Sequence, residues 1–590
     1  GPLVQGHSHN GEELHALSPH PFYPRYATAG DDATLRVWDA HDHSLIYRQD
    51  LEMPSRCIAY SPKGDKLAVG YGAPKKKNAK QFDGKWEVFN SGNWTTEYTA
   101  RDSQKYLTEC KWSPSGSILV FGSFDCKIWL YDAQNDYKLL AYLTEHNAPI
   151  RSIDFTTNSQ FFMSNCSAYE LRFFEAEGLH IPAASRLKDY RWATCTTPMQ
   201  WATQGCWPPQ NDRTDVLTCD ANLSNDLGNV VLATGDNFGR IRLYRFPCDS
   251  ALAQSKLYRA HGGASPISKV RWVAGDQYLV TMSAKERIIM QWVHDADDLG
   301  ATDDTEAQVM ELDPELREAA LGDEAGLALT EVSDPLGADM NLGSAAQEVS
   351  AKPWLSAIVE PSDAPSSDIS VPDYAISLDR AFGIQVASAR QCLAYNVLGE
   401  IIWPTAGVCV VYSKQSHEQK FFHEHRAAIT AIAVSANGCY VASGEKGNRP
   451  VVKLWDAQTC VEVASLGPFH RQGIACLAWS PDGKMVATVG QDIEHSIALW
   501  GSATGGWDDA RKLAYSPGDH QAIYYCVFLE QRFWGPGIEP QAPGVEGPKH
   551  PGFLFSTGGI DHVKLWAYEG RTITPVRGLW GDTGKRQPML

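Results

Sequence analysis

Apolar and polar residues alternate over short runs along most of the chain, and several of these runs come in pairs. The segments CIAYSPKGDKLAVG (57–70), CKWSPSGSILVFG (110–122) and CLAWSPDGKMVATVG (476–490) each hold two runs around a Ser-Pro pair. Alternation places every second side chain on one face of a strand, and Ser-Pro-x-Gly supplies the turn between two strands. The pattern predicts antiparallel strand pairs and an all-β fold.

A further strand ends in an aromatic residue, and this ending recurs through the chain. Most neighbouring endings lie about 40–50 residues apart, a period typical of WD40 blades, which have four antiparallel strands. Six such units precede residue 295 and four follow residue 373. We therefore predict WD40-type β-propellers in two propeller sections. The endings are Trp38, Phe89, Tyr131, Phe174, Tyr244, Trp292, Tyr412, Trp455, Trp500 and Trp566.

Some polar residues have structural positions in this pattern. His7 and Asp32 fit the His and Asp of the buried hydrogen-bond network that holds a WD40 blade, and His425 occupies the same position in a later blade. The neighbouring His423 and His425 have no third ligand at a recognisable spacing, so we predict no metal site and no cofactor. Fourteen cysteines are scattered singly, which favours reduced, buried thiols in a cytosolic protein.

Charge is distributed unevenly along the chain. The formal net charge is −18, yet residues 295–373 alone contain 20 acidic residues and two basic ones, so the remainder is neutral. The acidic segment has too few apolar residues to offset the cost of ordering it, and we predict a largely disordered linker that joins the two sections. Within it, KPWLSAIVEP (352–361) carries apolar residues that could dock on a folded neighbour.

The order of motifs resembles one family in particular. Residues 378–413 resemble the HELP motif of the echinoderm microtubule-associated protein-like (EML) family, and the first half of the chain resembles the second propeller of that family. The resemblance of the HELP-like segment lies in Phe382-Gly383, Leu398-Gly399-Glu400 and the apolar strand from Val408 to Tyr412. The segment FGIQVASARQC is more degraded than the usual basic version of this motif.

The resemblance implies three domains. Residues 1–294 form a propeller of six blade units, residues 295–373 form the acidic linker, and residues 374–590 form the HELP-like segment plus four blade units. Four units make an arc with open sheet edges. We expect the arc to close through further blades or by other means, and the first set to borrow a strand from residues 1–10 or from the HELP-like segment.

The resemblance also implies a function. We expect a non-catalytic, microtubule-associated scaffold in the cytoplasm and cytoskeleton, or in an axoneme, which binds tubulin or microtubule-bound proteins through propeller surfaces. The insertion GAPKKKNAKQFDGKW (72–86) lies between two strands, and a lysine-rich loop suits the acidic surface of tubulin as well as it suits simple solvation. The candidate partner-binding residues are Lys75, Lys76, Lys77, Lys80 and Lys85.

Two other classes of function stay open. One is a general WD40 adaptor in another assembly, such as a ubiquitin-ligase receptor or a ciliary scaffold, and the other is an enzyme with its site in a propeller channel. The sequence contains no Walker A loop and no GxSxG elbow. The charge balance disfavours a nucleic-acid binder, and no apolar run approaches the roughly 18 residues of a membrane span. The Trp/Pro-rich loops at Trp207-Pro208-Pro209 and 533–536 either fold back over the propeller rim or form an interface.

Overall fold

A computed structural model provides the coordinates and describes residues 5–7, 13–72, 84–207, 214–223, 230–263, 265–295, 302–303, 353–384, 392–504, 506–533, 552–560 and 562–578. Strands dominate this part of the chain, and three short 3-10 helices accompany them: η2 (Ala184–Arg186), η3 (Trp201–Cys206) and η5 (Pro353–Ser356). None of the helices in the described residues has the length and apolar character to cross a membrane.

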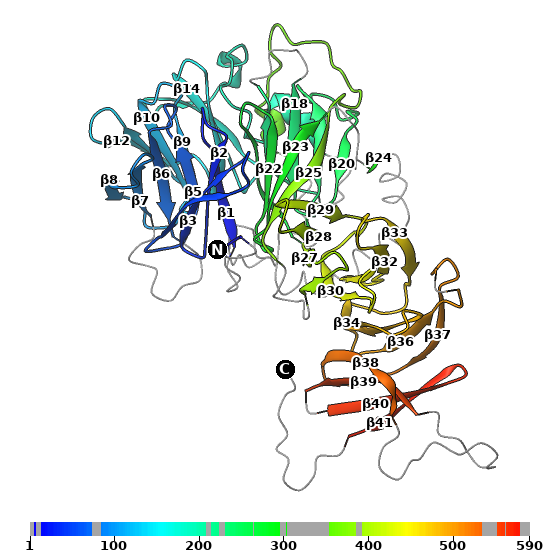
Figure 1. Ribbon diagram of the computed structural model, residues 1–590. Coiled ribbons are helices and arrows are strands. Elements are labelled where there is room, and N and C mark those ends of the chain that lie inside the picture. The colour runs from blue at the N-terminus through cyan, green and yellow to red at the C-terminus, as the bar shows by residue number, and fades with distance from the viewer. Residues whose placement is uncertain are drawn as a thin grey trace, which may run out of the picture. The chain divides into compact units, whose positions relative to one another are not determined.

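The strands form ten antiparallel sheets, as the alternation predicts (Figure 1). Six sheets belong to a first compact unit and four to a second. Within most sheets the strands follow one another in chain order, so each sheet is a meander. The sheets that we number one to six contain β1 (Leu14–Pro19), β2 (Arg25–Gly30), β3 (Thr34–Asp39), β4 (Leu45–Asp50); β5 (Ser55–Tyr60), β6 (Lys66–Tyr71), β7 (Lys85–Asn90), β8 (Thr96–Arg101); β9 (Leu107–Trp112), β10 (Ile118–Ser123), β11 (Ile128–Asp132), β12 (Lys138–Leu143); β13 (Ile150–Phe155), β14 (Phe161–Cys166), β15 (Leu171–Glu175), β16 (His180–Ile181); β17 (Val216–Ala221), β18 (Val231–Asp236), β19 (Ile241–Arg245), β20 (Lys256–Tyr258), β24 (Thr302–Asp303); and β21 (Ile267–Val273), β22 (Tyr278–Ser283), β23 (Ile289–Asp295), β25 (Ala375–Phe382).

The second unit has the same four-stranded pattern. Its first sheet, sheet seven, continues the HELP-like segment. Successive sheets contact one another in chain order: β27, the second strand of sheet seven, contacts β30, and the first strands β30, β34 and β38 of the following sheets contact one another in turn. Sheets seven to ten contain β26 (Ala394–Tyr395), β27 (Ile401–Thr405), β28 (Val408–Ser413), β29 (Glu418–Phe422); β30 (Ile429–Val434), β31 (Tyr440–Glu445), β32 (Val452–Asp456), β33 (Glu462–Leu466); β34 (Ile474–Trp479), β35 (Met485–Gly490), β36 (Ile497–Gly501), β37 (Arg511–Ser516); and β38 (Ile523–Phe533), β39 (Phe553–Gly559), β40 (His562–Glu569), β41 (Thr572–Arg577).

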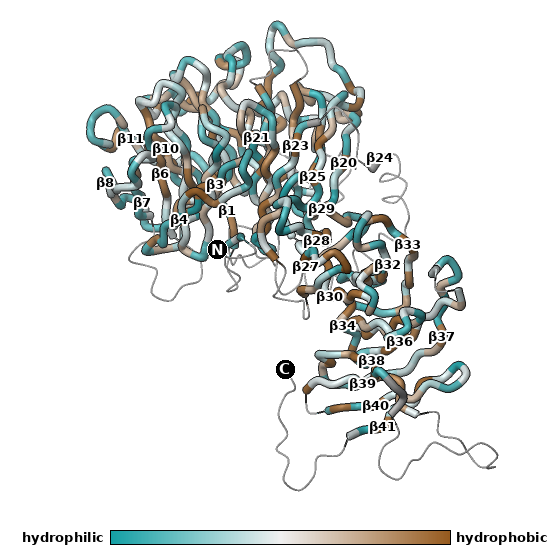
Figure 2. Tube along the Cα trace, viewed as in Figure 1, coloured by the Kyte–Doolittle hydropathy of each residue, from teal (hydrophilic) through white to brown (hydrophobic). Residues whose placement is uncertain are grey.

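The core lies between the faces of successive sheets. Apolar clusters join sheets one and two, two and three, three and four, and four and five, and a further cluster joins sheet six back to sheet one. First and second strands are therefore buried on both faces, whereas outer strands such as β4 and β8 alternate between partly buried and exposed positions. Brown and teal segments follow this division along the strands of Figure 2.

In some sheets, a glycine on the second strand allows close contact with the next sheet. A Cβ on Gly122 of β10 would lie 2.6 Å from Ile150 Cγ2 of the next sheet, and a Cβ on Gly444 of β31 would lie 2.6 Å from Ile474 Cβ. At Gly122 and Gly444 the missing side chain therefore has a packing function, because it lets the first strand of the next sheet approach.

The sixth sheet takes its outer strand from the HELP-like segment. β25 pairs antiparallel with β23, with Trp292 opposite Leu378 and Ile289 opposite Phe382. The expectation that the first set borrows a strand is thus met by residues 375–382. The expected boundary at residue 374 is wrong for this strand, because its hydrogen bonds place it in the first unit.

The same pairing changes the role of the acidic segment. It was expected to join the two sections, but it lies between β23 and β25, two neighbouring strands of one sheet. Residues 302–303 add a short strand to the edge of β20, and residues 353–373 pack on the first unit. The predicted disorder of residues 304–352 lies outside the described residues.

Candidate interaction surfaces

A repeated hydrogen-bond triad of His, Ser or Thr, and Trp holds individual sheets together. His7 Nε2 lies 2.8 Å from Thr28 Oγ1, and the indole N–H of Trp38 donates to the same oxygen at 2.8 Å. Asp32 completes the network at 3.1 Å from His7 Nδ1, as the sequence predicted. Burial lowers the pKa of His7, although Asp32 opposes the shift. Equivalent triads are His425–Ser443–Trp455 and His470–Thr488–Trp500.

The His423-Glu424-His425 triplet is explained by this network. His425 is buried, and its two ring nitrogens lie 3.1 Å from Glu445 Oε2 and 2.7 Å from Ser443 Oγ. The side chain of His423 is 52% exposed and is 4.0 Å from its neighbour Glu424. The imidazole of His425 is thus buried in the hydrogen-bond network, whereas that of His423 lies at the surface, so the two rings do not converge on one metal ion.

The predicted lysine loop connects β6 to β7, the second and third strands of sheet two. Lys75, Lys76, Lys77 and Lys80 lie outside the described residues. Lys85 is described, and it is the first residue of β7 rather than part of the loop.

Lys85 contacts two carboxylates and an aromatic ring close to sheet two. Its ammonium is 2.9 Å from Glu52 Oε2 and 2.9 Å from Glu87 Oε1, and it lies 5.5 Å from the ring centroid of Tyr71. Burial opposes its charge, but hydrogen bonds to Glu52 and Glu87 raise the pKa of Lys85 above its ordinary value. The structure accounts for Lys85 as a local ion-pair residue.

Charged side chains of the first unit meet around the axis of its six sheets. Lys269 of β21 forms an ion pair with Glu109 of β9. Because these strands belong to sheets six and three, which lie on opposite sides of a six-sheet ring, this pair spans the centre of the propeller. Lys111 and Asp154 pair between sheets three and four at 3.5 Å. The charges at the centre therefore compensate one another.

A second buried charge cluster joins sheets one and two. Arg56 is 2% exposed and donates to Asp31 at 3.1 and 2.6 Å and to Glu13 at 3.3 Å. His15 Nε2 lies 3.0 Å from Glu13. Burial by itself would raise the pKa of Glu13, but the hydrogen bond and charge of His15 and the charge of Arg56 lower it to about 2. Although Glu13, His15 and Asp31 are close enough to hold a cation, the guanidinium already supplies the positive charge.

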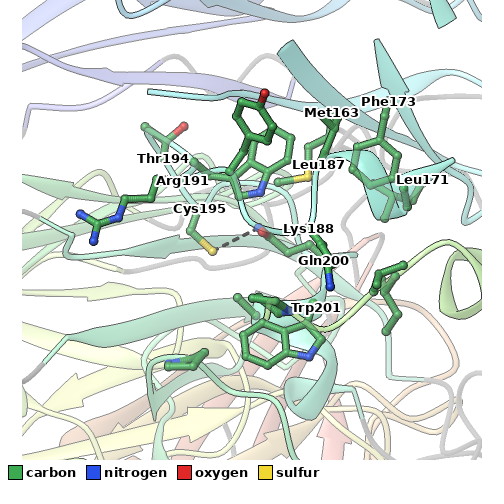
Figure 3. Close-up of a pocket in the computed structure, with 18 of the residues that line it drawn as sticks. Met163, Leu171, Phe173, Leu187, Lys188, Arg191, Thr194, Cys195, Gln200 and Trp201 are labelled. Carbon is green, nitrogen blue, oxygen red and sulfur yellow. Dashed lines mark hydrogen bonds between the residues drawn. The ribbon is translucent and has the colours of Figure 1, made fainter. Parts of the chain in front are cut away.

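An apolar cavity of about 630 Å³ lies on the first unit, away from its axis. Figure 3 shows Met163, Leu171, Phe173 and Leu187 around it, with the hydrogen bond from Gln200 to the Cys195 sulfur on one wall. The strands that line it, β14 and β15, are the second and third of sheet four. Sequence reasoning missed this cavity because its lining comes from distant segments, including residues 358–365 of the acidic segment.

The docking expectation for KPWLSAIVEP is confirmed at its tryptophan. Trp354 is 0% exposed in the core cluster of sheets four and five, 5.8 Å from the ring of Trp207. Trp207 is itself buried and donates its indole N–H to the carbonyl of Pro198 at 2.8 Å. The Trp207 loop thus folds back at this residue. Residues 208–209 and 534–536 lie outside the described residues.

Comparison with known proteins agrees with this architecture. Residues 14–294 match a family model described as the echinoderm microtubule-associated protein second beta-propeller, and residues 416–456 and 461–500 match the WD domain, G-beta repeat. Echinoderm microtubule-associated protein-like 1 from Rattus norvegicus is 29% identical over 296 residues, which cover 49% of this chain and 34% of the relative. Echinoderm microtubule-associated protein-like 3 from Homo sapiens is 29% identical over 296 residues, covering 49% and 31%. The chain thus spans about a third of the length of these curated relatives.

Proposed function

Because residues 14–294 are a propeller of the echinoderm microtubule-associated protein-like family, we propose that the chain is a non-catalytic scaffold that associates with microtubules through propeller surfaces. The observation that carries this proposal is the match itself, since it covers four complete sheets, four of the five strands of the fifth sheet, and β21, β22 and all but the last residue of β23 in the sixth. The relatives' names specify microtubule association. We propose tubulin or microtubule-bound proteins as the partners, and the cytoplasmic cytoskeleton or an axoneme as the location.

The arrangement of polar groups supports a binding role over catalysis. Charged residues at the centre of the first unit pair with one another, as Lys269 does with Glu109 and Lys111 with Asp154, and Arg56 pairs with Asp31 between sheets one and two. The 630 Å³ cavity lies elsewhere and has mainly apolar walls. An enzyme needs converging polar groups that remain available to substrate, and these two regions do not combine such groups with a cavity.

The contact with tubulin is proposed at the loop between β6 and β7. Lys75, Lys76, Lys77 and Lys80 place four cations within six residues of a connection between two strands. The acidic segment does not cancel this local charge, because the Debye length is only about 8 Å at physiological ionic strength. Such contacts are diffuse and depend on salt.

Cosedimentation with stabilised microtubules tests the function. The chain is expected to pellet with microtubules at low ionic strength and to lose binding as salt rises. Substitution of Lys75, Lys76 and Lys77 by Glu should weaken binding and flatten its salt dependence. Absence of binding to both microtubules and free tubulin at low salt would contradict the proposal and favour an adaptor in another assembly.

A further inference from the structure

The last part of the acidic segment forms a strap, residues 353–373, along sheets four and five. Its first fastening is apolar: η5 places Trp354 in the core cluster, and the backbone N–H of Trp354 donates to the carbonyl of Tyr169 at 3.1 Å. Beyond η5 the strap is open backbone, and most of its side chains are exposed. Ala357 and Ile358 still pack against the core cluster, and from Ser362 onward the strap is held mainly by polar contacts.

The central contact is between Ser362 and Asp189. The backbone N–H of Ser362 donates to Asp189 Oδ1 at 2.6 Å, and its hydroxyl donates to Oδ2 at 3.1 Å. These hydrogen bonds, the backbone one first, lower the pKa of Asp189 below its ordinary value. One serine thus uses both of its donors on one carboxylate, and both residues are exposed.

The far end of the strap is held by an arginine. Arg245 lies 3.3 Å from Asp368 and 2.8 Å from Asp373, and its Nε donates to Ser370 Oγ at 2.8 Å. The carbonyl of Ile369 accepts a hydrogen bond from the backbone N–H of Gln254 at 2.9 Å. After this point the chain enters β25. The strap is thus fixed independently at both ends, and Ser362 fastens the stretch between them.

That stretch is one wall of the apolar cavity. Ile358, Val359, Pro361 and Pro365 line it, opposite Leu187 and the strands of sheet four. Detachment of Ser362 would therefore open the cavity on this side without disturbing the buried Trp354 or the pairing of β25.

We propose that Ser362 is a phosphorylation site and that its modification detaches the middle of the strap from Asp189 and opens the apolar cavity. A protein serine kinase would transfer the γ-phosphoryl group of ATP to Ser362 Oγ. The O–P bond to serine forms as the bond between the γ-phosphorus and the ADP oxygen breaks, and the hydroxyl proton leaves to solvent. An exposed serine on open backbone suits such an enzyme, whose active site must surround the acceptor hydroxyl.

The phosphate reverses the character of the contact. The hydroxyl that donates to Asp189 becomes a group with close to two negative charges that can only accept. Glu360 and Asp363 on the strap add further negative charge beside it. On the side of the sheet, Lys188 neighbours Asp189 and is the cation nearest to it in the chain. Arg186 and Arg191 are further cations of the same segment, and Arg191 lines the cavity. The phosphate, however, replaces a donor in direct contact with Asp189, so we expect repulsion from this carboxylate to dominate.

The first experiment tests whether a protein kinase can phosphorylate the hydroxyl of Ser362. The full chain is incubated with Mg-ATP and an acid-directed serine kinase, and the modified residues are mapped by mass spectrometry. Phosphate on Ser362 is the expected result. Failure to modify Ser362 while other exposed serines of the strap accept phosphate would overturn the proposal.

The second experiment measures detachment. Hydrogen–deuterium exchange is followed in peptides covering 357–366 in the full chain, with β25 as an internal reference. The variant S362E should exchange at least ten times faster in this stretch and at an unchanged rate in β25. The matched control is S356E, which adds the same charge to the strap at a serine whose hydroxyl bonds only to Pro353 within its own turn.

A double variant distinguishes charge repulsion between Asp189 and position 362 from a general loss of structure caused by the substitution. In D189K/S362E the two positions carry opposite charges, so protection of 357–366 should return toward that of the unmodified chain. Unchanged or slower exchange in S362E would show that Lys188 captures the new charge and tightens the strap, and would overturn the proposal. Equal effects of S362E and S356E, or no rescue by D189K, would also overturn it.

Discussion

The indole of Trp38 and the ring of Phe382 pack with centroids 4.7 Å apart. Trp38 is the penultimate residue of the third strand of sheet one, and Phe382 is the last residue of the strand that the HELP-like segment adds to sheet six. Both are buried in the cluster that joins the last sheet of the unit to the first. The contact therefore closes the six-sheet ring with a strand that follows the acidic segment, residues 295–373, in the sequence.

The closing contact predicts a large loss of stability in Phe382→Ala. Removal of a buried Phe ring costs about 3–5 kcal/mol through lost burial and the resulting cavity. Chemical denaturation followed by circular dichroism measures the change in the free energy of unfolding. Phe22→Ala is the control because Phe22 is 71% exposed. Equal stability of the two variants would contradict a closing role for Phe382.

Gly122→Ala tests the close approach of sheets three and four. The added Cβ would meet Ile150 Cγ2 at 2.6 Å and Ile150 Cβ at 2.7 Å, so the sheets must separate. Overpacking of this kind costs about 1–3 kcal/mol. Gly92→Ala is the matched control, since the nearest atom to its new Cβ is the Asn90 side-chain oxygen at 3.3 Å. We expect a lower thermal midpoint for the first variant and little change for the second.

His470 predicts a specific pH dependence in the second unit. Burial lowers its pKa from the ordinary 6.5 to about 4. The folded state therefore favours the neutral ring, and this contribution is fully present above pH 6.5 and is lost as the pH falls through 4. The shift corresponds to about 3 kcal/mol at most.

The measurement compares the chain with His470→Gln in urea unfolding from pH 4 to pH 7.5. The difference in unfolding free energy should be largest at neutral pH and should shrink toward pH 4. His423→Gln is the control, and it should give only a small difference because the side chain of His423 is 52% exposed. A constant gap for His470→Gln would argue against a buried neutral imidazole.

Lys85→Met tests whether Lys85, the first residue of β7, contributes to microtubule binding as the loop lysines are proposed to do. Loss of its contacts with Glu52 and Glu87 is expected to cost about 1 kcal/mol or less, because the pair is partly exposed. Microtubule cosedimentation should match that of the unaltered chain. If this variant binds as weakly as the charge reversal of Lys75, Lys76 and Lys77, then Lys85 takes part in binding despite its partners.

The sheets could be predicted from the sequence because their signals, the alternation of apolar residues and the turn residues, lie within each strand pair. The aromatic endings such as Trp38 and Trp566 each end or lie in the third strand of a sheet, and the His7–Asp32 pairing follows from a repeated spacing. The docking of KPWLSAIVEP was likewise visible, because Trp354 is an isolated apolar anchor in an acidic segment.

The candidate interaction sites were harder to predict from the sequence than the sheets. A run of lysines predicts a basic loop, but the sequence does not show that Lys85 begins β7 or that its ammonium pairs with Glu52 and Glu87. The strap contact of Ser362 with Asp189 joins residues 173 positions apart. Neither residue carries a local signal for the other.

The sequence by itself determined an all-β chain of repeated four-stranded units, since alternation and turn residues act between neighbouring strands. The tertiary structure decided which strand completes the sixth sheet, and so converted the acidic segment from a linker into an insertion between β23 and β25. The physical reason is that an edge strand accepts any partner with free backbone hydrogen bonds and a matching apolar face. That choice depends on which segment the closing ring brings to the edge, and no local pattern encodes it.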